Sequence, residues 1–126
     1  MKLLIAGGRD FNNLELMLHH LEGMYKLGEI DDSVELICGM ARGADMLGHH
    51  IFSQANLPIH VFKPDWNGLG KRAGFVRNAE MGDVADLALI FWDQKSKGTK
   101  HMIDYMAKLQ KPVRIVYYNQ GALCPY

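Results

Sequence analysis

A short polar loop with hydroxyl, lysine and glycine residues follows one of the most apolar stretches of the sequence. The apolar stretch, residues 86–91, predicts a buried strand, and residues 99–109 have the spacing of a helix. Glycine lets a ligand approach the backbone, and the first amides of a helix lack partners at the positive end of the helix dipole. We therefore predict that the loop is one wall of a phosphate-binding site, through Ser96, Lys97, Gly98 and Thr99. A plain N-cap role is the alternative for Thr99.

Arginines beside glycines in two further loops would supply other walls of the same site. Arg9 follows a pair of glycines after the first apolar stretch, and Arg42 lies between two glycines after the second. Arginine offers bidentate hydrogen bonds to phosphate or carboxylate, so we expect both to contact phosphate. An ion pair between Arg42 and Asp45 is the alternative. The loop glycines are expected either to let a ligand approach the backbone or to act as ordinary turn residues: Gly7, Gly8, Gly39, Gly43 and Gly98.

Four more side chains are candidates for contacts with the rest of a ligand. Asp93 follows the fourth apolar stretch and is expected to hold a ribose hydroxyl, as acidic residues do in other Rossmann sites, or to cap the loop. Trp66 either stacks on a base or covers the edge of the sheet. Asn78 is expected to reach the ligand from the first turns of a helix, and its neighbour Arg77 is expected to pair with an acidic residue of the same helix, Glu80 or Asp83.

The positive charges of the chain gather around these loops although the formal net charge is zero. Such a cluster gives a local positive field that attracts a small anion, whereas a neutral chain argues against a whole surface that binds nucleic acid. The alternative is that loops are polar in any case and lysines solvate them. Nine of the 14 Lys and Arg residues lie in or beside the loops: Arg9, Arg42, Lys63, Lys71, Arg72, Arg77, Lys95, Lys97 and Lys100.

Strand-like and helix-like stretches alternate along the whole chain, which predicts right-handed βαβ units and a parallel sheet covered on both faces. We expect one domain over residues 1–126, an α/β Rossmann-like three-layer sandwich with five parallel strands in the order 3-2-1-4-5. Ligands bind such sheets where the strand order reverses, here between the first and fourth strands. The expected strands are residues 2–6, 34–38, 59–62, 86–91 and 112–117, the expected helices are 14–25, 44–55, 71–81 and 99–109, and residues 119–126 are expected to be a loose tail.

The composition narrows the setting and the partners. No apolar run approaches the ~20 residues of a membrane span, and residues 1–6 are too short for a signal peptide. Two cysteines, Cys38 and Cys124, do not suggest a disulfide framework, so we expect a cytoplasmic protein. We expect no metal, because the adjacent histidine pairs would point about 100° apart on a helix and so could not share one. We also expect no cofactor. The methionine-rich helices predict either core packing or the face of a homo-oligomer.

Four blocks of sequence together resemble the YspA-related branch of the SLOG superfamily. They are residues 7–11 (GGRDF), 39–45 (GMARGAD), 65–66 with 73–78 (DW and AGFVRN), and 91–93 with 96–99 (FWD and SKGT), in the family's order. The resemblance implies a Rossmann-like fold that binds nucleotides or nucleotide-derived ligands, often linked to stress or phage-defence signalling. Members of this branch are often small stand-alone proteins of bacteria and phages.

The same superfamily includes the LOG ("Lonely Guy") enzymes and the DNA-processing protein DprA, which imply two alternatives. LOG enzymes cleave a nucleoside monophosphate to free base and ribose phosphate with a Pro-Gly-Gly-x-Gly-Thr-x-x-Glu block; here Met102 holds the position of that glutamate. We therefore expect first a non-catalytic binder of a nucleotide-derived, ADP-ribose-like ligand. A LOG-like N-glycosidase, with Asp93 or Asp45 as the catalytic carboxylate, comes second. Binding of single-stranded DNA comes third.

Overall fold

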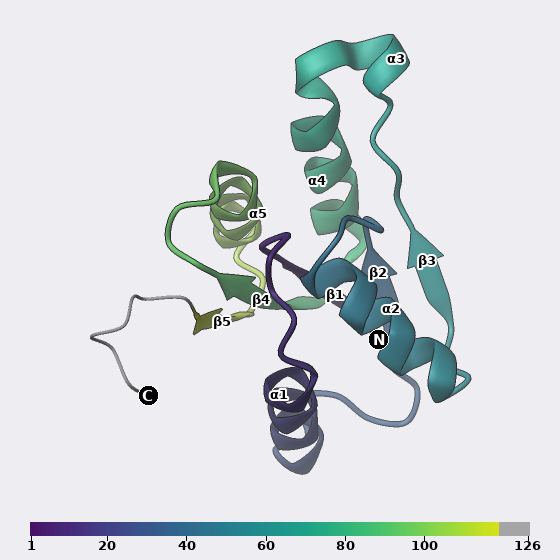
Figure 1. Cartoon of the computed structure of the whole chain (residues 1–126). Coiled ribbons are helices and arrows are strands. Elements are labelled where there is room, and N and C mark those ends of the chain that lie inside the picture. Colours follow the sequence, from purple (N-terminus) through teal and green to yellow (C-terminus); the bar gives the residue numbers. More distant parts are fainter. Residues whose placement is uncertain (119–126) are drawn as a thin grey trace.

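Strand β1 (Lys2–Gly7) is the central strand of a five-stranded parallel sheet in the computed structural model of the chain, which describes residues 1–118. The order β3-β2-β1-β4-β5 confirms the predicted Rossmann-like sandwich (Figure 1). The other strands are β2 (Glu35–Cys38), β3 (Ile59–Val61), β4 (Leu87–Trp92) and β5 (Val113–Tyr117). The expected loose tail, with Cys124, lies outside the described residues.

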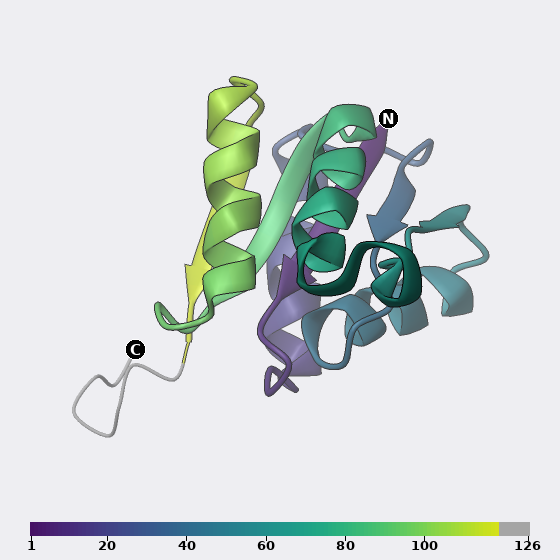
Figure 2. The ribbon, with the colours of Figure 1, turned by 90° about the horizontal axis from the view of Figure 1, so that it is seen from above.

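Helices cover both faces of the sheet. Helices α1 (Leu14–Lys26) and α2 (Ala44–Gln54) lie on one face, and α4 (Ala73–Val84) and α5 (Lys97–Lys108) lie side by side on the other (Figures 1 and 2). Strands β1 and β4 are therefore buried from both sides, which explains why their sequences are continuous apolar runs. These two strands pair with each other over five residues, from Leu3 with Leu87 to Gly7 with Phe91.

Each face of the sheet has its own apolar core. Leu3, Ile5 and Phe91 point towards α1 and α2, whereas Leu4 and Ile90 pack against α4 and α5. Four of the methionines predicted for a core or an oligomer face are buried in these cores: Met17, Met24, Met102 and Met106. Met46 of α2 is 41% exposed.

The segment between β3 and α4, residues 63–70 of which belong to none of the expected strands and helices, contains regular structure. It contains the short helix α3 (Trp66–Leu69) and the 3-10 turn η1 (Gly70–Arg72), which lead directly into the amino end of α4 (Figure 1). The carboxylate of Asp65 accepts the amide of Gly68 at 2.9 Å and so caps α3. Gly70, at φ +59°, ends it. Helix α4 consequently begins at Ala73 and runs to Val84, later at both ends than the predicted 71–81.

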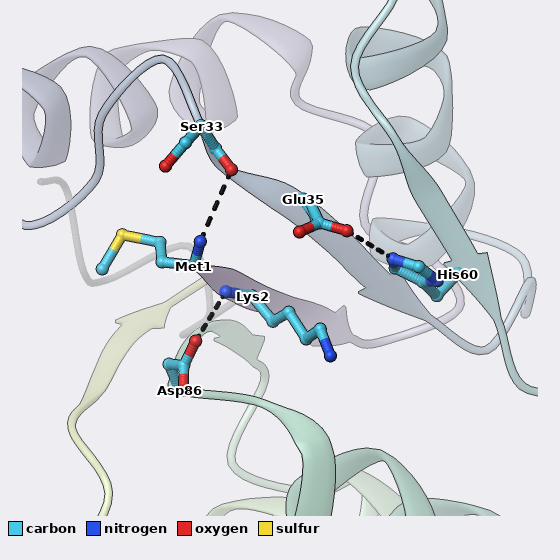
Figure 3. Close-up of polar contacts among 6 residues, drawn as sticks. All are labelled: Met1, Lys2, Ser33, Glu35, His60 and Asp86. Atoms are coloured by element: carbon cyan, nitrogen blue, oxygen red, sulfur yellow. Dashed lines mark hydrogen bonds and ion pairs between the residues drawn. The ribbon is translucent and has the colours of Figure 1, made fainter.

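Polar contacts hold together the amino ends of the central strands (Figure 3). The amide of Lys2 donates to Asp86 Oδ2 at 2.7 Å, beside the start of β4. Glu35 Oε1 lies 2.7 Å from His60 Nε2, and this hydrogen bond lowers the pKa of Glu35. The loops predicted to form the ligand site lie at the opposite edge of the sheet, at the carboxyl ends of the strands. Within residues 1–118, helices long and apolar enough to cross a membrane are absent.

Candidate functional site

The loops after β1, β2 and β4, with α3, η1 and the first turns of α4 and α5, enclose a cavity of about 500 Å³ at the carboxyl edge of the sheet. It lies beside the strands where their order reverses, as expected for this fold. Ten of the predicted site residues line it: Gly7, Gly8, Arg9, Asp45, Trp66, Asn78, Asp93, Ser96, Gly98 and Thr99. Four others are not among its lining residues, namely Gly39, Arg42, Gly43 and Lys97.

Arg42 does not line the cavity, and it does not form the ion pair with Asp45 that was its alternative role. Its side chain is exposed on the loop between β2 and α2, and the ion pairs of residues 1–118 do not include it. Asp45, its expected partner, instead accepts the amides of Gly39 at 3.1 Å and Ala41 at 3.4 Å through Oδ2. The Arg42–Asp45 ion pair is therefore wrong. The Asp45 side chain thus holds the loop between β2 and α2 by accepting hydrogen bonds from the backbone amides of that loop.

Arg77 lines the cavity in place of Arg42, and its predicted pairing with Glu80 or Asp83 is wrong. Its Nη1 donates to the carbonyl of Gly39 at 3.1 Å, and its Nε donates to Asn78 Oδ1 at 3.2 Å. A side chain at Gly39 would put its Cβ 2.1 Å from Arg77 Nη1, so this glycine makes room for the guanidinium. Sequence reasoning missed the contact because the acceptor is a backbone carbonyl 38 residues away.

Asp45 is a buried carboxyl group that lines the cavity, with only 3% of its surface exposed. Burial raises the pKa of Asp45 to about 6, although Arg77 and the loop amides favour the ionised form. A carboxyl group that titrates this close to neutral pH is suited to exchange a proton with a bound ligand.

Side chains of the loop after β4 cap that loop and the start of α5. Asp93 Oδ1 accepts the amides of Lys95 and Ser96, both at 2.8 Å. Burial raises the pKa of Asp93, but the backbone hydrogen bonds and the charge of Lys95 together leave the pKa below its usual value. Asp93 therefore has the capping role that was its alternative. The N-cap of α5 is Ser96 rather than Thr99, and the helix begins at Lys97, two residues before the predicted start.

Thr99 and Ser96 are bonded to each other. The amide of Thr99 donates to Ser96 Oγ at 3.3 Å, and the hydroxyl of Thr99 donates to the same oxygen at 3.0 Å. Several of the amides and hydroxyls that were expected to hold phosphate are thus already hydrogen-bonded within the turn.

Asn78 joins α4 to α5 beneath the cavity. It is 6% exposed, and its Nδ2 donates to the carbonyl of Gly98 at 3.1 Å. The same Nδ2 lies 3.3 Å from Nδ1 of His101, whose pKa burial lowers, so the neutral ring can accept this bond. With the Arg77 contact, both ends of the Asn78 amide are occupied by the protein.

Asn78→Ala is expected to lower the free energy of unfolding by about 2 kcal/mol, because it removes the part-buried hydrogen bonds that this buried side chain makes to Arg77, Gly98 and His101. Urea denaturation measures the loss. Asn67→Ala, on the exposed surface of α3, is the control and is expected to change stability by less than about 0.5 kcal/mol. Equal effects of the two substitutions would contradict the bracing role of Asn78.

Gly8 and Gly43 allow the loops after β1 and β2 to touch. The amide of Ala44 donates to the carbonyl of Gly8 at 3.4 Å. A Cβ at Gly43 would lie 2.1 Å from that carbonyl oxygen, and Gly43 has φ +85°. A Cβ at Gly8 would meet the Tyr118 hydroxyl, which donates to Asp10 at 2.6 Å. These two glycines are required for packing between loops, and this packing fixes the backbone of Arg9.

Three cations line the cavity without a salt bridge. Arg9, Lys71 and Arg77 all face it, and the salt bridges within residues 1–118 involve other residues. Two aromatic rings also line it while remaining substantially open to solvent, Trp66 at 53% and Phe75 at 49% exposure. Sequence reasoning missed Lys71 and Phe75 as site residues. Phe75 could have been predicted as a site residue, because it belongs to the same AGFVRN block as Asn78.

Groups of three or more His, Cys, Asp or Glu side chains placed to hold a metal are absent from residues 1–118. Burial raises the pKa of the Cys38 thiol to about 11, so this cysteine stays protonated. Comparison with family models, curated proteins and solved structures gives no match. The function of the protein is therefore inferred from the site.

Proposed function

We propose that the protein binds a nucleotide or a nucleotide-derived, phosphorylated ligand, such as an ADP-ribose-like signal, in the cavity at the carboxyl edge of the sheet. The observation that carries the proposal is the combination of cations outside salt bridges with exposed aromatic rings around one cavity. Cations recognise phosphate, and an aromatic face stacks on any base. A nucleotide has both groups in one molecule.

The volume and position of the cavity support the same proposal. About 500 Å³ is within the range of small-molecule sites, and the switch point of a Rossmann-like sheet is where such ligands bind. Apolar side chains such as Met81 and Met102 line the cavity together with the charged groups. The four sequence blocks that resemble SLOG proteins point to the same class of ligand.

AMP, ADP and ADP-ribose are expected to raise the melting temperature of the protein, with adenosine giving a smaller rise because it lacks phosphate. Differential scanning fluorimetry measures the rise, and chromatography of the same samples is expected to recover the nucleotides unchanged. Trp66→Ala should weaken nucleotide binding by about tenfold through loss of stacking. Tyr25→Ala, an equally exposed aromatic residue on α1 outside the cavity, is the control. No rise with any nucleotide would contradict the proposal.

Nucleotide N-glycosidase activity is the second candidate, and the buried carboxyl of Asp45 favours it. A pKa of about 6 lets this group act as a general acid or base in the cavity, in place of the glutamate that Met102 replaces. Asp93 is a weaker candidate, since its Oδ1 is held by two amides and its pKa is lowered. Release of free base that Asp45→Asn abolishes would favour hydrolysis over simple binding.

A further inference from the structure

Two arginines from different parts of the fold, Arg9 of the loop after β1 and Arg77 of α4, face the same cavity. Arg77 is held in place by the Gly39 carbonyl and Asn78 Oδ1, so its guanidinium is positioned before any ligand arrives. Arg9 lies close enough for its charge to lower the pKa of Arg77, after the larger effect of burial and against the opposing effect of Asp45. The two guanidinium groups face one cavity and can hold one anion between them, although the carboxyl groups of Asp10, Asp45 and Asp93 also line it.

The other expected anion site, the loop before α5 and the first turn of that helix, is partly occupied by protein groups. Asp93 accepts two amides there, and Ser96 accepts the amide and hydroxyl of Thr99. A phosphate at this turn would have to displace the Asp93 carboxylate or lie beside it. Lys97, the cation of the turn, does not line the cavity.

We propose that the phosphate of the bound ligand lies between Arg9 and Arg77, beside the loops that follow β1 and β2, and not at the first turn of α5. The inference rests on the proposed function, because it assigns the anionic part of that ligand to one side of the cavity. It also leaves the exposed rings of Trp66 and Phe75 for the base. The expected ligands are phosphate monoesters or diphosphates whose phosphate group is bound by both guanidinium groups at once.

The position of the anion can be measured with inorganic sulfate, a dianion whose charge is constant near neutral pH. In amide NMR titrations of the full chain, we expect saturable shifts at residues 8–10 and at the Arg77 side chain. Arg9→Ala should weaken sulfate and AMP binding by at least about tenfold. Arg72→Ala removes the same charge from an exposed position on η1 outside the cavity, and it should weaken binding by less than about twofold.

The dependence of sulfate affinity on pH gives a second readout. An anion beside Arg77 is also near Asp45, so binding should strengthen as the pH falls from 7.5 to 5.5 and Asp45 takes up a proton. Of the other groups around Asp45, Arg77 of α4 stays charged and Cys38 of β2 stays protonated. An anion at the α5 turn would lie beside Asp93, which stays ionised over this range, and near His101, whose pKa burial lowers. Its affinity would not follow the titration of Asp45, so Asp45→Asn would leave its pH dependence unchanged.

The possible results separate this inference from the proposed function. Saturable sulfate binding that Arg9→Ala weakens, without binding of any nucleotide, would support the anion site and overturn the proposed function. Nucleotide binding that Arg9→Ala and Arg72→Ala weaken equally would keep the function and overturn the anion site. Largest shifts at residues 95–99, or no saturable shift, would also overturn it.

Discussion

The protein is expected to lose stability through Asp45 as the pH rises from about 4 to about 6, and Asp45→Asn is expected to remove that loss. Burial raises the pKa of Asp45 from 3.8 to about 6 in the folded state. Between these values the unfolded chain releases the Asp45 proton while the folded chain retains it. Stability therefore falls as the pH rises through this window. Above about pH 6 the contribution of Asp45 to stability no longer changes with pH.

The size of the effect follows from the shift in pKa. One pKa unit corresponds to about 1.4 kcal/mol, so the loss from Asp45 is at most about 3 kcal/mol. The carboxamide that Asp45→Asn introduces can still accept the loop amides through its oxygen but carries no charge to bury. Denaturant unfolding of both proteins at pH 4, 5, 6 and 7 gives the comparison. The difference in stability between Asp45→Asn and the natural protein should grow in favour of the variant as the pH rises.

Asp93→Asn is the matched control with the opposite sign. The pKa of Asp93 is lowered in the folded state, so its contribution to stability is present above the unfolded pKa and is lost as the pH falls. Asp93→Asn should therefore become less stable relative to the natural protein as the pH rises. If the stability difference between Asp45→Asn and the natural protein stays constant from pH 4 to pH 7, the pKa of Asp45 is not raised in the folded state.

The fold could be predicted because the chain alternates clearly between buried strands and amphipathic helices. The apolar runs of β1 and β4 are continuous because both faces of these strands are covered. Helix α3 could not be predicted, since it has four residues and depends on one Asp65 side chain rather than on a periodic pattern. The predicted start of α5 is too late because Ser96, its N-cap, has a hydroxyl that suits a ligand contact equally well.

The candidate site could be predicted in outline but not in its hydrogen bonds. Parallel strands bring the loops after β1 and β4 to one edge, so residues such as Arg9 and Ser96 were expected to meet. Arg77 was assigned to partners on its own helix, because acidic residues at short separations, such as Glu80 at i+3, are visible in a sequence. Its actual partner, the carbonyl of Gly39, depends on how α4 packs against the end of β2, and no local pattern records that packing.

Gly43→Ala is expected to destabilise the protein by about 3–5 kcal/mol and to weaken binding in the cavity, because two effects add at this position. The backbone has φ +85° and ψ −127°, which an L side chain adopts only with strain. The new Cβ would also lie 2.1 Å from the Gly8 carbonyl oxygen and 2.8 Å from the backbone of Arg9. Because all the neighbouring atoms are backbone atoms, the whole loop after β1 has to move.

Gly28→Ala separates the two effects. Gly28 follows the end of α1 with φ +76°, and a Cβ there would have no atom within 4 Å. It should therefore destabilise by only about 1 kcal/mol, through backbone strain alone. Urea unfolding of the two variants measures the difference, and AMP titration below the melting temperature tests the cavity. Because Gly43→Ala shifts the backbone of Arg9, it should weaken AMP binding, whereas Gly28→Ala should leave it unchanged. Equal losses of stability in the two variants would mean that the loops after β1 and β2 do not depend on each other.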